Sequence, residues 1–208
     1  VTGNTRRYGA SLEKIKKVVA PRPGEIMFGL NMIVNKGKTV FVGDTSVHEY
    51  PTSDQLAEIA ISSARVVRLF GFDPKVAFVS HSTFGQPLTS RTKHIKNAVE
   101  ILKEKNVDFK FDGDMQPDVA LNDQYKELYP FSEIVGNSNV LIMPGQHSAA
   151  ISYKMMRELG GAKVIGPLLI GLGQPIEIAP LRSSTSDILN LASVAAYSAG
   201  VINYNKKN

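Results

Sequence analysis

A polar loop after a predicted buried strand carries the densest group of side chains that can do chemistry. Residues 76–80 (VAFVS) read as the strand, and the run SHSTFG, Ser80–Gly85, opens from its end. Hydroxyls and free backbone N–H groups in such a loop can hold phosphate or another anion. The spacings of a P-loop and of a nucleophile elbow are both absent. A turn whose hydroxyls satisfy the local backbone is the structural alternative.

An acidic run is the second candidate. Asp112–Asp118 (DGDMQPD) places three carboxylates within seven residues, which suits acid–base work or a hard cation. The EF-hand spacing fails because no Glu stands at the twelfth position. A turn followed by a helix N-terminus explains the same carboxylates, since Asp is favoured there by capping and by the helix dipole.

Two helix starts complete the set of candidates. Pro144–Ser148 (PGQHS) and Arg182–Asp187 (RSSTSD) each lead into a predicted helix, where free N–H groups attract anions. A plain N-cap is the alternative for the second run. The glycines around Gly166 and Gly171 permit close backbone approach, but the dinucleotide pattern G-x-G-x-x-G is not matched. No His pair or His–carboxylate pair has metal spacing, so no metal site is predicted.

Alternating strands and helices must position these loops. Helices of 10 to 18 residues between strands predict parallel βαβ units and a three-layer αβα fold with a mostly parallel sheet. The carboxyl ends of parallel strands meet at one edge, so the loops should form one ligand cleft. The predicted strands are 25–34, 39–43, 76–80, 108–111, 139–143, 164–170 and 175–178, and the predicted helices are 11–19, 52–70, 90–105, 117–127, 146–159 and 186–199.

Composition narrows the class of protein. The 208 residues include no cysteine, which excludes disulfides and thiol chemistry and fits a cytoplasmic protein. No apolar run approaches 18 residues, so no membrane partner is expected. The net charge of +5 is scattered without a block of like charges. Such a balance fits nucleic acid, an anionic small ligand or a solvated surface that happens to be basic; we expect the small ligand as partner and no nucleic acid. The opening VTGNTRRYGA suggests a fragment of a longer protein.

Taken in order, these stretches resemble the phosphate acetyltransferase (phosphotransacetylase) family over about residues 41–199. The Ser-x-Ser-Thr-x-Gly pattern of that family matches Ser80–Gly85, and its Asp-Gly-Glu-x-Gln-x-Asp pattern matches Asp112–Asp118 with Asp114 in the Glu place. Two further patterns match Asn139–Pro144 and Gly166–Pro175. The resemblance implies the two-lobed fold of isocitrate and isopropylmalate dehydrogenases, with residues 1–23 and 177–208 in one truncated lobe and 24–176 in the other.

A closer resemblance is to the phosphotransacetylase-like C-terminal region of bacterial hybrid malic enzymes, carried by 41–52 (FVGDTSVHEYPT) and 187–190 (DILN). It implies that malate is decarboxylated with NAD(P) and a divalent metal in a part outside this chain. This region would bind acetyl-CoA, acetyl phosphate or a related anion, regulate the parent enzyme and assist homo-oligomer formation. The implied ligand-binding residues are Ser80, Ser82, Thr83, Gly85, Arg91, Asp112, Gln116, Pro144, Ser148, Gly166, Pro167 and Gly171.

The sequence departs from the family at one catalytic position. Active members carry Ser-Arg-Gly-Cys-x-x-x-Asp before the last helix, and alignment on Asp187 places Leu181 at the Arg. Leucine cannot replace the bidentate donors of arginine, so transfer chemistry should be impaired unless Arg182 reaches the cleft. Asp187 and Arg182 would be the catalytic residues of an active acetyltransferase, which is the first alternative. A structural dimerisation module with a vestigial pocket is the second.

Overall fold

The computed structural model describes the backbone of residues 1–207 and the side chains of residues 1–200. A six-stranded sheet runs through the molecule, and all its neighbouring pairs are parallel except those of β2, which is antiparallel to both its neighbours. This agrees with the predicted mostly parallel sheet. In spatial order the strands are β5 (Lys110–Met115), β4 (Lys75–Val79), β6 (Val140–Ile142), β3 (Lys38–Gly43), β2 (Phe28–Asn35) and β7 (Lys163–Ile170).

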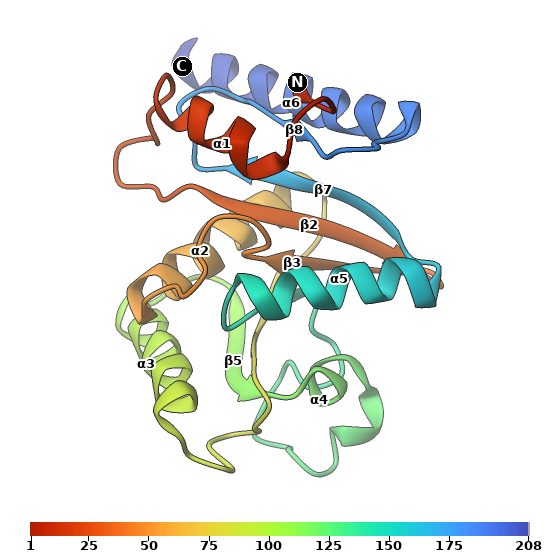
Figure 1. The fold of residues 1–208 in the computed structure, drawn as a ribbon. Helices are drawn as coiled ribbons and strands as arrows, with labels where there is room; N and C mark the ends of the chain where they lie inside the picture. The colour runs from red at the N-terminus through yellow and green to blue at the C-terminus, as the bar shows by residue number, and fades with distance from the viewer. Residues whose placement is uncertain (208) are drawn as a thin grey trace.

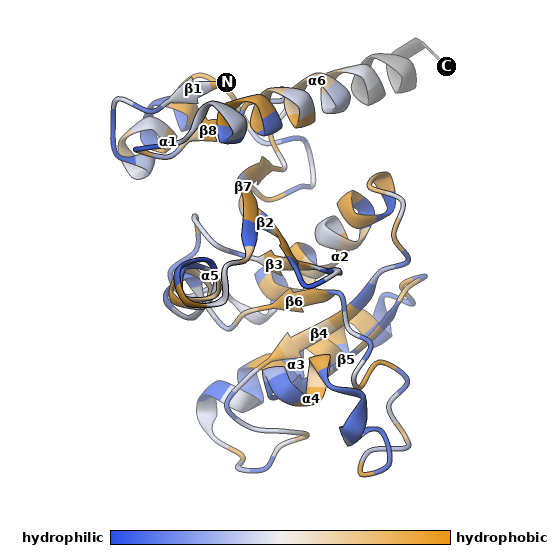
Figure 2. Ribbon diagram, turned by 90° about the vertical axis from the view of Figure 1, so that its right-hand side faces the viewer, coloured by the Kyte–Doolittle hydropathy of each residue, from blue (hydrophilic) through white to orange (hydrophobic). Residues whose placement is uncertain are grey.

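Helices cover both faces of the sheet. Figure 2 shows α5 (Gln146–Gly160) on one side of the sheet and α2 (Ser53–Leu69) on the other. The core on the α2 side also includes α3 (Ser90–Glu104) and the large buried side chains Phe28, Phe41 and Phe78. The core on the α5 side includes α4 (Pro117–Leu121). The chain therefore has the predicted three layers.

The two ends of the chain form a separate layer beyond β7. Strand β1 (Thr2–Gly3) pairs in parallel with β8 (Ile178–Ala179), and α1 (Tyr8–Lys16) and α6 (Thr185–Lys207) pack beside them. Figure 1 shows this layer at the top of the molecule, above β7 and β2. We propose, as the resemblance implies, that it belongs to a first lobe made of residues 1–23 and 177–208, with residues 24–176 as the second.

Local sequence explains where the main helices begin and end. The Thr52 hydroxyl accepts the Gln55 N–H at 3.1 Å, and Gln55 Oε1 accepts the Thr52 N–H at 2.8 Å, which completes the expected capping box of α2. Gly161 follows α5 with a φ of +63°, a left-handed conformation that favours glycine. None of the described helices is both long and apolar enough to cross a membrane.

Five predicted elements differ from the structure, among them the strand predicted at 175–178, which is β8 at Ile178–Ala179. The predicted strand 108–111 is β5, which continues to Met115, so the acidic pair Asp112 and Asp114 lies within a strand and not in a turn. The predicted helix 117–127 ends at Leu121, and a 3₁₀ turn, η1 (Asp123–Tyr125), follows, with the Asn122 side chain accepting the Gln124 N–H. Helix α1 begins at Tyr8, three residues before the predicted start, and α6 extends past Ala199 to Lys207.

Candidate functional site

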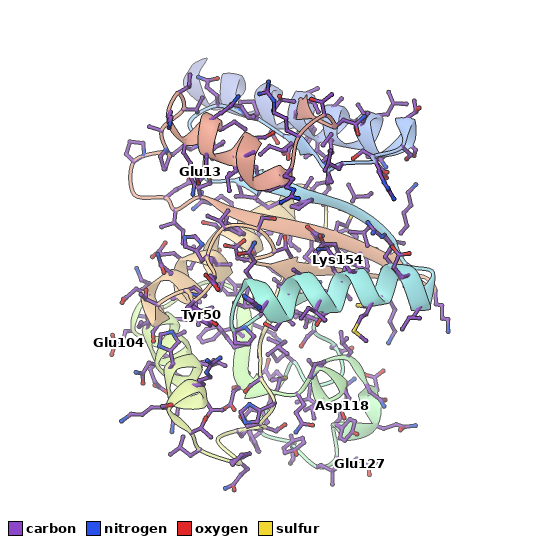
Figure 3. The ribbon with its side chains drawn as sticks, in the orientation of Figure 1. Glu13, Tyr50, Glu104, Asp118, Glu127 and Lys154 are labelled. Carbon is purple, nitrogen blue, oxygen red and sulfur yellow. The ribbon has the colours of Figure 1, made fainter. Side chains whose placement is uncertain are left out.

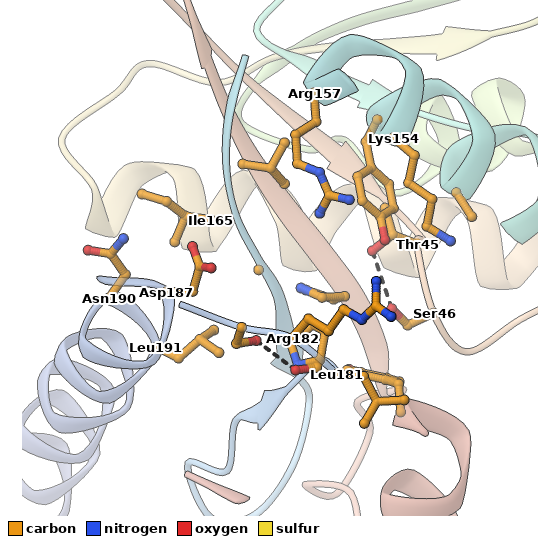
Figure 4. A pocket seen from close by; sticks show the side chains of 18 of the residues that line it. Thr45, Ser46, Lys154, Arg157, Ile165, Leu181, Arg182, Asp187, Asn190 and Leu191 are labelled. Atoms are coloured by element: carbon orange, nitrogen blue, oxygen red, sulfur yellow. Dashed lines mark hydrogen bonds between the residues drawn. The ribbon is translucent and has the colours of Figure 1, made fainter. Parts of the chain in front are cut away.

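A cleft of about 550 Å³ lies where the terminal layer meets the sheet. One wall is formed by α5 and the first half of β7, and the other by α1, residues 180–183 and the start of α6. Figure 4 shows the side chains of both walls, and Figure 3 shows Lys154 on the side of α5 that faces the terminal layer. The cleft is therefore built from segments far apart in sequence.

The lining of the cleft is strongly cationic. Four basic side chains and one carboxylate, Asp187, belong to it. Arg157 forms an ion pair with Glu158 at 2.7 Å, whereas the other three have no carboxylate partner among the described residues. Uncompensated positive charge in a partly enclosed site favours an anionic ligand. The basic residues are Lys154, Arg157, Lys163 and Arg182.

A buried carboxylate fixes the loop that forms the floor of the cleft. Asp44, which is 1% exposed, follows β3 and accepts hydrogen bonds from the backbone N–H groups of Gly29, Ser46, Val47 and His48 and from His48 Nδ1. These donor–acceptor distances range from 2.7 to 3.2 Å. The neighbouring Thr45 and Ser46, which line the cleft, are thus held on a rigid loop, as ligand recognition requires.

Arg182 reaches the cleft although it stands one position after the expected arginine. Its φ of +65° is left-handed, and its guanidinium points across the cleft towards Ser46 and Lys154 (Figure 4). The turn beneath it is closed by the Ser183 hydroxyl, which donates to the Pro180 carbonyl oxygen at 2.7 Å. The condition for a functional arginine in the cleft is therefore met.

Asp187 lines the cleft but is engaged in a helix cap. Its Oδ2 accepts the Ser184 N–H at 2.9 Å and the Ser184 hydroxyl at 2.8 Å, and its own N–H donates to Ser184 Oγ at 3.2 Å. In Figure 4 it lies beside Ile165 and Asn190, well away from the Arg182 guanidinium. The N-cap alternative for this run is thus present in the structure, alongside a place in the cleft.

The predicted loop at Ser80 lies outside the cleft lining. Ser82, fully buried, donates its hydroxyl to Asp114 Oδ2, and Asp114 Oδ1 accepts the Gly85 N–H at 3.0 Å. Thr83 Oγ1 accepts the Gln116 N–H at 3.3 Å. We call the set Ser80, Ser82, Thr83, Gly85, Asp114 and Gln116 the Ser82–Asp114 cluster. Its polar groups satisfy one another, and the role of its members as ligand-binding residues stays a prediction.

Two of the other predicted residues line the cleft and the rest do not. Gly166 and Pro167 line the cleft. Ser148 donates its hydroxyl to the Gly145 carbonyl oxygen at 2.8 Å, next to Pro144, and Asp112 Oδ1 accepts the Gly113 N–H at 2.8 Å. Ser148, Pro144 and Asp112 are not among the residues that line the cleft. Arg91, with its guanidinium 5.6 Å from the centre of the Tyr50 ring, and Gly171, where the carbonyl oxygen accepts the Arg22 N–H, also lie outside it.

Several cleft residues were not predicted as site residues, although Thr45, Ser46, Tyr153 and Lys154 lie in stretches that carry the family resemblance. Lys154 and Arg157 follow Tyr153 on α5, where i, i+4 spacing from Ala150 defines a helix face, but only the fold shows which face meets the terminal layer. Tyr8 lies 174 residues before Arg182 in the chain. The missed residues are Tyr8, Thr45, Ser46, Tyr153, Lys154, Arg157, Lys163 and Asn190.

Burial perturbs three titratable groups near the cleft. It raises the pKa of Tyr8 well above its ordinary value, against the opposing effect of a hydrogen bond with the Ser46 side chain. It also raises the pKa of Tyr153, against the effect of the Arg157 charge. Glu177, which is 3% exposed, has its pKa raised to about 8 by burial, against the effect of its hydrogen bond from the Leu169 N–H. No group of three or more His, Asp or Glu side chains among the described residues is arranged to hold a metal ion.

Comparison with known proteins finds relatives among malic enzymes and phosphate acetyltransferases. The chain is 47% identical to an NADP-dependent malic enzyme of Rhizobium meliloti over 96% of this chain and 26% of the relative. It is 34% identical to a phosphate acetyltransferase of Clostridium acetobutylicum over 96% of this chain and 62% of the relative. A phosphotransacetylase structure from Streptococcus pyogenes superposes with a TM-score of 0.89 and 29% identity, covering 95% of this chain and 61% of that one.

The chain thus spans about a quarter of the length of the malic enzymes that it matches. The family model for phosphate acetyl/butaryl transferases matches residues 1–196, nearly the whole chain. The three-layer fold, the ordered sequence patterns and this match lead to one conclusion: the chain belongs to the phosphate acetyl/butaryl transferase family.

Proposed function

We propose that this chain is the phosphotransacetylase-like regulatory region of a malic enzyme, and that it binds acetyl-CoA or a related anionic metabolite in the cleft. Its similarity to NADP-dependent malic enzymes supports the identity of the parent protein. Oxidative decarboxylation of malate to pyruvate, with NADP or NAD and a divalent metal, would then be the work of the part outside this chain.

The charge of the cleft is the observation that carries the proposal. Lys154 and Lys163 come from the sheet side and Arg182 from the terminal layer, and none has a carboxylate partner among the described residues. An anionic ligand between the walls would contact both and hold them together. A ligand that binds one arrangement of two layers more tightly than another shifts the equilibrium between them, which is the physical basis of regulation.

Two features argue for ligand binding over acetyl transfer. Catalysis requires the acid–base group and the cation to converge on the reacting atoms. Asp187 instead holds the Ser184 cap, and the Arg182 guanidinium is turned towards Ser46. The active acetyltransferase remains the alternative, and the observation in its favour is that both side chains line one cleft.

A calorimetric titration and an assay of acetyl phosphate formation on the same sample test the proposal. We expect saturable binding of acetyl-CoA and no acetyl phosphate above background when phosphate is added. Sustained formation of acetyl phosphate would replace the regulatory function with the transferase, and no heat at millimolar acetyl-CoA would reject both. The effect on the parent protein is measured as malate-dependent reduction of NADP with and without acetyl-CoA.

Homo-oligomer formation is part of the same proposal and has its own observation. Ile151, Met155 and Leu159 recur at i, i+4 spacing on α5 and are 57%, 54% and 82% exposed. An apolar stripe of this kind on a helix commonly packs against another protein surface. Sedimentation analysis should show a dimer or larger species, and replacement of Met155 and Leu159 by Gln should shift it towards the monomer.

A further inference from the structure

Glu177 is a buried carboxyl at the place where the chain passes from the sheet to the terminal layer. It stands immediately before β8, in the segment that leads there from the end of β7. Its Oε2 accepts the Leu169 N–H of β7 at 2.9 Å, and its carbonyl oxygen accepts the Thr2 N–H of β1 at 2.9 Å. One residue therefore ties the outer strand of the six-stranded sheet to the two strands of the terminal layer (Figure 1).

The surroundings of Glu177 suit a neutral carboxyl and not a carboxylate. Glu177 is 3% exposed and forms no ion pair with any side chain that the structure describes. A carboxylate can accept about four hydrogen bonds, whereas the described residues supply its side chain with one N–H. The other donors would have to be water molecules, because an ion without partners is costly in an apolar place. That place is a buried apolar cluster shared by α1, β7 and β8, made of Leu12, Ile15, Met27, Leu169, Leu172 and Ile178.

Two titratable groups act on Glu177 from the neighbouring elements. Burial raises the pKa of Glu177 to about 8, against the effects of the Leu169 N–H and of the positive α-amino group of Val1 beside β1. The Tyr8 phenol on α1 interacts with the Glu177 charge, and burial raises the pKa of Tyr8 well above its ordinary value. Tyr8 therefore stays neutral near pH 8, so a change of charge at this junction near that pH comes from Glu177 or from Val1.

We propose that Glu177 is a proton-dependent latch between the terminal layer and the sheet. In its protonated form it holds the two layers together at this junction, and loss of the proton parts them so that water reaches the carboxylate. The layers have to part because water has no other access to a residue that is 3% exposed. The cleft lies between the same two layers, so the latch controls how its walls stand to each other. The inference goes beyond the proposed function and does not depend on which ligand the cleft binds.

The latch weakens as pH rises. In the open state the hydrated carboxyl has an ordinary pKa of about 4.3, whereas in the closed state the pKa is raised to about 8. Between these two values the opening releases a proton, so the equilibrium constant for closure falls about tenfold per pH unit. Above about pH 8 both states are ionised and the constant no longer changes.

Hydrogen exchange of the Leu169 amide in the full chain, followed by NMR between pH 6 and pH 8, tests the latch. Its protection relative to an unstructured amide at the same pH should fall about tenfold per pH unit in the wild type. In Glu177→Gln the side-chain oxygen can still accept the Leu169 N–H but the group cannot ionise, so the protection should stay constant. Glu177→Leu removes both charge and acceptor and should lower the protection equally at every pH. Glu127→Gln, at an exposed position, is the matched control and should follow the wild type.

The amide of Phe78, in the buried strand β4, reports unfolding of the whole chain and is the reference. The latch predicts that Leu169 is less protected than Phe78 at each pH. Equal protection of the two amides would show that water reaches Glu177 only when the whole chain unfolds, and would overturn the inference. The same pH course of Leu169 in the wild type and in either Glu177 variant would also overturn it. Acetylation of the Val1 amino group should leave the tenfold slope in place, and loss of the slope would assign the titration to Val1 instead.

Discussion

Two groups of polar side chains in this chain differ in whether the fold itself satisfies them. In the Ser82–Asp114 cluster, Ser82 is fully buried, Asp114 is 1% exposed, and their polar groups pair with one another. In the cleft, the charged groups of Lys154, Lys163 and Arg182 have no carboxylate partner among the described residues. The first group is satisfied within the protein, whereas the second leaves positive charge without a counter-ion.

The difference shows why residue types alone do not locate a ligand site. Buried polar groups are paired in folded proteins, so a hydroxyl-rich loop after a strand is often occupied with its own structure. What marks a ligand site is a donor or charge that the fold positions and leaves unsatisfied. That property depends on segments distant in sequence, such as those that carry Lys154 and Arg182.

Asp114→Ala should give the largest effect, because it removes the central acceptor of the Ser82–Asp114 cluster. It leaves the Ser82 hydroxyl and the Gly85 N–H without their acceptor in a buried place, so we expect a loss of about 3–5 kcal/mol in the free energy of unfolding. Urea denaturation measures it. Asp118→Ala, on the exposed surface, is the control and should cost under about 1 kcal/mol. A stable Asp114→Ala protein that no longer bound acetyl-CoA would make the cluster a ligand site.

Glu177 sharpens the comparison because it is a buried carboxyl whose one side-chain hydrogen bond among the described residues comes from the Leu169 N–H at 2.9 Å. Burial raises its pKa to about 8 in the native state. Between the unfolded pKa of about 4.3 and that value, the unfolded state loses its proton while the native state keeps it. The free energy of unfolding therefore falls as pH rises through this window.

Glu177→Gln should abolish that part of the pH dependence, because the amide oxygen can still accept the Leu169 N–H without ionising. We expect the variant to gain about 2–4 kcal/mol over the wild type between pH 5 and pH 8. Urea midpoints across this range measure the gain, with the exposed Glu127→Gln as control. Parallel profiles for the wild type and Glu177→Gln would mean that Glu177 is already ionised in the native state at low pH.

Arg182→Gln tests the second group directly. The affinity for acetyl-CoA should fall about 10- to 50-fold through loss of a charge-assisted contact, with little change in the urea midpoint. Lys96→Gln removes the same charge from the exposed face of α3 and should change the affinity by less than about twofold. Equal effects of the two variants would show that Arg182 acts only through the net charge of the protein and not through a contact with the ligand.

Asp187→Asn should give the smallest effect. Asp187 is the third residue of α6, and the side-chain oxygen of Asn can still accept the Ser184 N–H, so we expect a loss below about 1 kcal/mol in stability and an acetyl-CoA affinity within about twofold of the wild type. Calorimetry and urea denaturation measure both. Loss of a measurable acetyl phosphate activity in this variant, present in the wild type, would instead identify Asp187 as a catalytic base.

Much of the fold followed from local signals. The Thr52–Gln55 capping box, the alternation of strands and helices, and Gly161 after α5 located these elements to within a few residues. The predicted end of the strand at residue 111 was wrong. Asp and Gly are poor strand formers, but Asp112 and Asp114 lie in β5 because pairing with β4 outweighs their low strand propensity.

The site was predicted less fully than the fold. Gly166, Pro167, Arg182 and Asp187 were found from patterns in the chain and do line the cleft. Tyr8, Ser46 and Lys154 were not predicted as site residues. Ser46 and Lys154 lie in stretches that carry the family resemblance, but only the fold, in which α1, the loop after β3 and α5 meet, shows that they line one cleft. A cation without a counter-ion is likewise a property of the folded chain, and no sequence pattern records it.

A crystal structure of the chain with acetyl-CoA would test the central claim most directly. The account predicts the anionic part of the ligand between the Lys154 ammonium and the Arg182 guanidinium, with the Ser82–Asp114 cluster unchanged. A ligand bound instead against Ser80–Gly85, with the Ser82–Asp114 hydrogen bond opened to receive it, would contradict the account.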